Sequence, residues 1–256
     1  GLAYCASDPS IVMTAGSRYQ KSGAGYVELS TDYGNTYTLS EGWQAANTPT
    51  SAAISAVKQK NGYPILMIYS NSGKPGVYRS LDFGKTWELS LSDDKKILED
   101  ANGKSLNADW VDGNKFYMML KDGSFYMTSD GGDSWQHTST IRENLPWPQV
   151  TKSVPNMEGH VWTSAKNNGL YTTADSGYTW TKLLGVDKCY GFGFGKNKDG
   201  VREPSIYLYG VCGGKEGIFR SDDYAKTWTE IGNPGQNPGF VTSIEGDANV
   251  YGRVYI

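Results

Sequence analysis

The chain has 256 residues, with 24 Lys and Arg against 27 Asp and Glu, a formal net charge of −3 and 13% aromatic residues. The lack of a cationic excess argues against a nucleic-acid-binding protein, and the aromatic content argues against a disordered chain. We therefore expect no nucleic-acid partner. No uncharged apolar run reaches the roughly 18 residues that span a bilayer, so we also expect no membrane partner.

One short motif recurs five times along the chain. It reads Ser or Thr, any residue, Asp, any residue, Gly, any residue, Thr or Ser, and then an aromatic residue; Ala225 replaces Gly in the last copy. In chain order the copies span residues 30–37, 80–87, 128–135, 173–180 and 221–228. Their aspartates lie 50, 48, 45 and 48 residues apart, a period typical of stacked or radial repeats.

Each copy of the motif lies between two strand-like segments, such as residues 76–79 before the second copy and 86–89 after it. The motif therefore predicts a hairpin turn, and two further strand-like segments precede it in each period, for example residues 64–69. Four short strands per repeat indicate an all-β fold made of β-propeller blades. We predict five such blades, with two more strands within residues 241–256.

The motif aspartates are expected to be structural. An aspartate in a tight turn accepts hydrogen bonds from nearby backbone amides, and Gly supplies the positive φ that the turn needs. We therefore interpret Asp32, Asp82, Asp130, Asp175 and Asp223 as turn clamps. The tryptophans that end four of the motifs, Trp87, Trp135, Trp180 and Trp228, are expected to pack between blades.

The motif resembles the Asp box of sialidase-like propellers, which occurs in glycan hydrolases, sorting receptors and photosystem assembly factors. The segments between the boxes are similar to glycoside hydrolase family 74, the xyloglucan-degrading enzymes, over essentially the whole chain. The resemblance is carried by residues 1–6 (GLAYCA), 154–162 (VPNMEGHVW), 191–196 (GFGFGK), 204–210 (PSIYLYG) and 246–255 (GDANVYGRVY).

This resemblance implies a function for the complete protein. Family members have two seven-bladed propellers with the substrate groove between them, and they cleave the β-1,4-glucan backbone of xyloglucan with inversion. Neither catalytic aspartate of the family has a matching position in this chain. The resemblance thus implies that residues 1–256 are an incomplete C-terminal propeller domain, inactive alone, which forms one wall of the groove of a secreted enzyme.

An incomplete propeller leaves blade edges open, so we expect the N-terminal propeller of the same enzyme, or another chain, to cover them. Two alternatives remain open. The chain could be a non-catalytic carbohydrate-binding propeller, or a protein-interaction propeller that binds no glycan.

Candidate ligand contacts lie on the face opposite the boxes, where the loops between strands 2 and 3 of a blade, and between successive blades, emerge. Sugar rings stack on exposed aromatic faces, and we select Tyr19, Trp43 and Trp147 as candidate substrate-binding residues. The alternative for each is an anchor that holds its loop against a neighbouring blade. The acidic residues available on the same face are Asp93, Asp94, Glu99, Asp100 and Glu143. The run from Asp93 to Glu99 also contains Lys95 and Lys96, which favours a solvated loop.

No pattern in the sequence indicates a cofactor or a metal. The two histidines, His137 and His160, fall in different repeats, so neither a metal cluster nor a catalytic triad can be argued from them.

The cysteines allow two interpretations. If Gly195 pairs with Ile206 in a regular hairpin, Cys189 faces Cys212, and an oxidising compartment would favour a disulfide. A bulge in the hairpin would break that register. Three reduced, buried thiols are the other interpretation.

Overall fold

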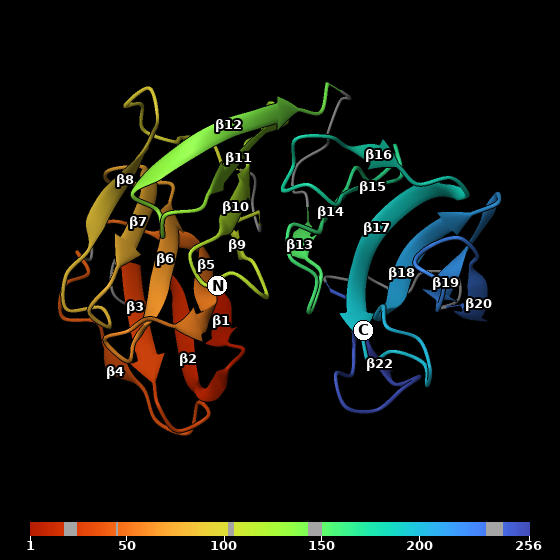
Figure 1. The fold of residues 1–256 in the computed structure, drawn as a ribbon, viewed down its shortest axis with the longest axis horizontal. Helices are drawn as coiled ribbons and strands as arrows, with labels where there is room; N and C mark the ends of the chain where they lie inside the picture. The colour runs from red at the N-terminus through yellow and green to blue at the C-terminus, as the bar shows by residue number, and fades with distance from the viewer. Residues whose placement is uncertain (18–24, 45, 102–104, 143–149, 234–242) are drawn as a thin grey trace.

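The computed structural model describes residues 1–17, 25–44, 46–101, 105–142, 150–233 and 243–256. Every regular element among them is a β-strand (Figure 1), so the all-β prediction is confirmed, and none of these residues forms a helix that could span a membrane.

The strands are short. In chain order they are β1 (Leu2–Cys5), β2 (Asp8–Ser17), β3 (Gly25–Ser30), β4 (Thr38–Leu39), β5 (Pro49–Lys58), β6 (Pro64–Ser70), β7 (Gly76–Ser80), β8 (Glu88–Ser92), β9 (Asn107–Ala108), β10 (Phe116–Met119), β11 (Ser124–Thr128), β12 (Ser134–Thr140), β13 (Thr151–Ser153), β14 (Val161–Ser164), β15 (Leu170–Thr173), β16 (Thr181–Lys182), β17 (Val186–Gly195), β18 (Ser205–Cys212), β19 (Lys215–Ser221), β20 (Thr229–Gly232), β21 (Glu245–Gly246) and β22 (Val254–Tyr255).

Consecutive groups of four strands form antiparallel meanders, which we number unit 1 (β1–β4) to unit 5 (β17–β20), and the β21–β22 hairpin follows them. Each Asp box is the turn between the third and fourth strands of its unit. The outer strands of units 2 and 3, β8 and β12, pair in parallel, so these two units share one eight-stranded sheet.

The units succeed one another around a common centre (Figure 1). The first strand of one unit lies near that of the next: β1 contacts β5, β5 contacts β9, β9 contacts β13, and β17 contacts β21. First strands are therefore innermost and fourth strands outermost, as in a propeller.

The sequence of each strand follows from its place in this arrangement. The second strand of unit 2, β6, is buried at every position, because units pack on both of its faces, and its apolar residues suit that setting. The outermost strands β4 and β16 are exposed at both of their residues. The core is thus a series of apolar clusters between neighbouring units, one cluster for each pair.

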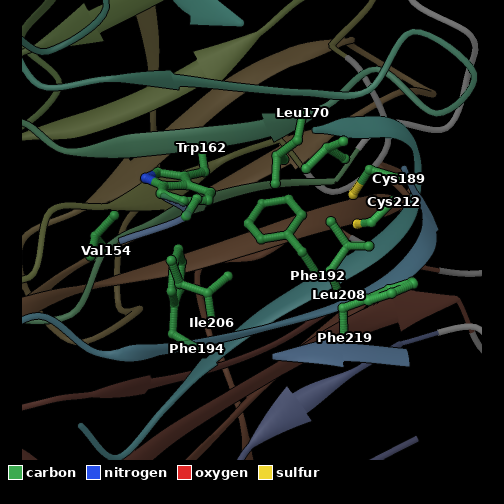
Figure 2. Close-up of a cluster of buried hydrophobic side chains, with 12 residues drawn as sticks. Val154, Trp162, Leu170, Cys189, Phe192, Phe194, Ile206, Leu208, Cys212 and Phe219 are labelled. Atoms are coloured by element: carbon green, nitrogen blue, oxygen red, sulfur yellow. The ribbon is translucent and has the colours of Figure 1, made fainter. Parts of the chain in front are cut away.

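Figure 2 shows the cluster between units 4 and 5. Trp162 from β14 is fully buried there, and its ring packs edge-on against Phe194 of β17 with 5.7 Å between centroids. The ring also contacts Tyr224 from the fifth box, with 5.3 Å between centroids. Side chains of two successive units therefore interlock around one tryptophan.

The strand register that would place Cys189 opposite Cys212 is wrong, and the interpretation of three reduced, buried thiols is confirmed. In the β17–β18 ladder Cys189 pairs with Gly210 and Cys212 with Val186, because two register shifts interrupt the strand on either side of Cys189. All three cysteines are free thiols and buried. Burial raises the pKa of the Cys189 and Cys212 thiols to about 12.

Candidate functional site

The box aspartates hold their own turns. In the first box Asp32 Oδ1 accepts hydrogen bonds from the Ser30 hydroxyl at 2.7 Å and the Thr36 backbone N–H at 2.9 Å. Asp32 Oδ2 accepts from the Thr36 hydroxyl at 2.7 Å, and the Gly34 N–H donates to Ser30 Oγ at 2.9 Å. The same contacts recur around Asp82, Asp130, Asp175 and Asp223. The expectation that these residues are turn clamps is confirmed.

These contacts keep the box carboxyl groups ionised. Hydrogen bonds from the Thr36 backbone, the Thr36 hydroxyl and the Ser30 hydroxyl lower the pKa of Asp32 to about 2. At the other four boxes burial raises the pKa, but hydrogen bonds from the Ser and Thr of each turn outweigh it, and the pKa stays below its ordinary value. A group ionised throughout the neutral range is a poor general acid, so these residues are unsuited to that catalytic role.

Box tryptophans join neighbouring units through a serine. Trp135 Nε1 donates a hydrogen bond to Ser90 Oγ of unit 2 at 2.8 Å, and the Ser90 hydroxyl donates to the Gly132 carbonyl of the third box. We call this arrangement the serine relay. It recurs with Trp87, Ser40 and Gly84, and with Trp180, Ser139 and Gly177. The tryptophans are therefore packing residues, as predicted.

The junction between units 4 and 5 lacks the relay. Leu183 stands three residues after Trp180, the position that Ser90 holds after Trp87. Among the described residues, the buried Trp228 Nε1 has no hydrogen-bond partner. Leu183 and Trp228 instead pack against the apolar cluster of Figure 2.

Trp43 lies on the expected face, in the loop between β4 and β5. Its ring makes edge contacts with Tyr78 at 5.4 Å and with Trp87 at 5.3 Å between centroids, and its Nε1 donates to the Asn47 carbonyl at 3.2 Å. Half-buried, the ring packs on the cluster between units 1 and 2, so these contacts anchor the loop. The other two candidates, Tyr19 and Trp147, lie outside the described residues.

A polar pocket of about 220 Å³ opens on the same face, between units 2 and 3. Its lining includes Thr50, Tyr69 and Asn71 from unit 2, Glu99 and Asp100 from the loop after β8, and Lys121 from the β10–β11 turn. The Ala101 N–H donates to the Tyr69 hydroxyl at 3.1 Å, and Lys121 Nζ donates to Asp100 Oδ1 at 2.9 Å. Folding thus gathers groups from two units into one cavity.

Sequence reasoning placed the two acidic residues of this pocket on the correct face but not in a cavity. It missed Tyr69 and Asn71, because Tyr69 lies near the end of the buried strand β6 and Asn71 directly follows that strand, and nothing in a strand pattern marks these positions as pocket lining.

The described residues contain no group of three or more His, Cys, Asp or Glu side chains that could hold a metal ion. His160 Nδ1 lies 2.7 Å from the Tyr224 hydroxyl, and burial lowers the pKa of His160. His137 lies in β12 and His160 precedes β14, so the two histidines belong to different units, as expected.

Comparison with known proteins agrees with this architecture. The family model of the BNR-Asp box repeat matches residues 77–89 and 218–231. The xyloglucanase Xgh74A of Acetivibrio thermocellus is 43% identical over 60% of this chain and 18% of its own length. A xyloglucanase of Paenibacillus sp. is 29% identical over 90% of this chain and 22% of its own length.

Among solved structures, the GH74 enzyme of Niastella koreensis superimposes on the whole chain with a TM-score of 0.80 at 28% identity. The match covers 35% of that enzyme.

The fold and the boxes define an Asp-box β-propeller segment. More narrowly, the chain is a segment of the Asp-box propeller type found in glycoside hydrolase family 74. It spans 18% to 22% of the length of these curated relatives.

Proposed function

We propose that this chain is part of a secreted glycoside hydrolase that cleaves the β-1,4-glucan backbone of xyloglucan with inversion. Residues 1–256 would be an incomplete C-terminal domain, five blades and part of another from a seven-bladed propeller. The observation that carries the proposal is the similarity to a named xyloglucanase at 43% identity over 60% of the chain.

The segment contributes binding surface rather than catalytic groups in this proposal. The box carboxylates are occupied within their turns, and the resemblance to the family gives its two catalytic aspartates no matching position in this chain. The face opposite the boxes forms one wall of the groove, and the N-terminal propeller of the same enzyme forms the other. Tyr19, Trp43 and Trp147 are proposed to contact the glucan from this wall.

Activity of the complete protein tests the proposal. The complete protein that contains this chain should release oligosaccharides from xyloglucan, and nuclear magnetic resonance should show the α-anomer of the new reducing end first, because inversion at a β-linkage yields it. Residues 1–256 alone should release no sugar. Failure of the complete protein to hydrolyse xyloglucan, or initial release of the β-anomer, would refute the proposal.

The alternatives give different outcomes in the same experiment. A carbohydrate-binding propeller would bind xyloglucan without hydrolysis. A protein-interaction propeller would bind no glycan at all.

A further inference from the structure

We propose that the polar pocket between units 2 and 3 binds one neutral sugar residue that branches from the glucan main chain. This inference rests on the proposed function, since it assigns a subsite to the same ligand face. The pocket has a volume of about 220 Å³, which is smaller than the roughly 300–1,000 Å³ of pockets that hold drug-sized ligands. A single sugar ring suits that space better than an oligosaccharide does.

The polar groups of the pocket suit a polyol. Each sugar hydroxyl both donates and accepts a hydrogen bond, so a sugar site needs donors and acceptors close together. Among the described residues the Tyr69 hydroxyl accepts from Ala101, and its own proton is available to a ligand oxygen. The Asn71 amide supplies both a donor and an acceptor, the Glu99 carboxylate supplies acceptors, and Pro75 adds an apolar wall.

The charges in the pocket disfavour an anionic ligand, and a neutral sugar carries no charge for the carboxylate to repel. The Asp100 carboxylate forms an ion pair with Lys121 at 2.9 Å, so its charge is compensated within the protein. Glu99 is exposed and has no ion pair among the described residues, which leaves one carboxylate facing the pocket. That carboxylate repels an anion, and the described residues gather no set of three metal-ligating side chains here.

The pocket is held in shape before any ligand arrives. The Lys121 N–H donates to the Asp100 carbonyl at 2.9 Å, and Ala101 bridges to Leu120, so the loop after β8 is fixed to unit 3. On the other side the Lys74 N–H donates to Asn47 Oδ1 at 3.0 Å. A fixed site loses little conformational entropy on binding.

Trp43 helps to hold the segment around Lys74 that forms this side of the pocket. Tyr78, which packs against Trp43, donates through its hydroxyl to the Lys74 carbonyl at 2.8 Å. Besides the glucan contact proposed above, Trp43 therefore positions the loop that carries Asn71 and Pro75.

Binding by two ligands tests this subsite. We would measure by calorimetry, on the complete protein, the dissociation constants of the branched oligosaccharide that remains after the protein has digested xyloglucan to completion, and of an unbranched β-1,4-gluco-oligosaccharide with the same main-chain length. Glu99→Gln and Asn71→Ala should each weaken binding of the branched ligand about three- to tenfold, as expected for one lost hydrogen bond. Binding of the unbranched ligand should not change.

Asp199→Asn is the matched control. Asp199 is exposed in the turn between β17 and β18, which lies on the box side and therefore opposite the pocket. Its substitution by Asn removes one negative charge, as Glu99→Gln does. It should leave both constants unchanged. Because Glu99 and Asn71 are exposed, both test variants should fold, and thermal unfolding checks this.

The outcomes separate the two proposals. If the unmodified protein binds neither ligand, the proposed function is wrong. If it binds the branched ligand and both variants bind it equally well, the proposed function stands and the subsite is wrong. Equal losses for both ligands would also overturn it, because the pocket would then contact the main chain.

Discussion

Replacement of Ser90 by Ala removes one buried hydroxyl group and should strongly reduce the stability of the fold. Ser90 is 2% exposed and Trp135 is 0% exposed, so no water can take over their hydrogen bonds. Ser90→Ala removes the acceptor of the Trp135 indole N–H and the donor to the Gly132 carbonyl. A buried polar group without a partner costs about 1–3 kcal/mol, and two are created here. We expect a loss of about 2–6 kcal/mol in the free energy of unfolding.

Chemical denaturation of the wild type, Ser90→Ala, Trp135→Phe and the double variant gives the required comparison. Trp135→Phe removes the indole N–H, so the cycle isolates the hydrogen bond from the packing loss. The coupling free energy should be about 1 kcal/mol or more. A Ser90→Ala variant within 0.5 kcal/mol of the wild type, roughly the usual range of neutral surface substitutions, would refute the relay as a stabilising link.

Trp228→Phe should destabilise the protein less than Trp180→Phe, by about 1 kcal/mol or more, because the Trp180 N–H has a serine partner and the Trp228 N–H has none; equal losses in urea denaturation would contradict this. Because the pKa of Cys189 and of Cys212 is raised to about 12, neither thiol should react with a thiol reagent in the native protein at pH 8. After denaturation without reductant all three thiols should react, whereas a single reactive thiol would indicate a disulfide. The lowered pKa of Asp32 means that its stabilising effect is complete above about pH 4 and is lost as the pH falls towards 2, so Asp32→Asn should flatten the acid slope of stability in that window, whereas Asp199→Asn should not.

Local features of the fold could be predicted from the sequence. The turn clamp around Asp32 depends on residues within seven positions of one another, so the motif alone specifies its hydrogen bonds.

Features that depend on two units could not be predicted. Ser40, Ser90 and Ser139 give no sign in the sequence that they accept from a tryptophan more than 40 residues away. The register of β17 with β18 was missed for another reason, since a strand pattern does not reveal where extra residues bulge out of the ladder.

The candidate site was predicted in part. Trp43 lies on the expected face, but its contacts with Tyr78 and Trp87 come from strand β7 and from the second Asp box of the next unit, which no local pattern could indicate. The pocket with Tyr69 and Glu99 is also formed by residues about 30 positions apart, and it exists as a cavity only after the loop following β8 has folded back onto β6.

The parallel pairing of β8 with β12 bears on aggregation. An exposed strand edge can add strands from other molecules, and longer edges do so more readily. Outer strands β4 and β16 have two residues each and β20 has four, so these edges offer few free backbone groups. The longer outer strands β8 and β12, of five and seven residues, pair with each other near the third box. The pairing joins Ser134 with Leu91 and Trp135 with Ser92, so the chain covers with its own strands the part of these two edges that lies next to the third box.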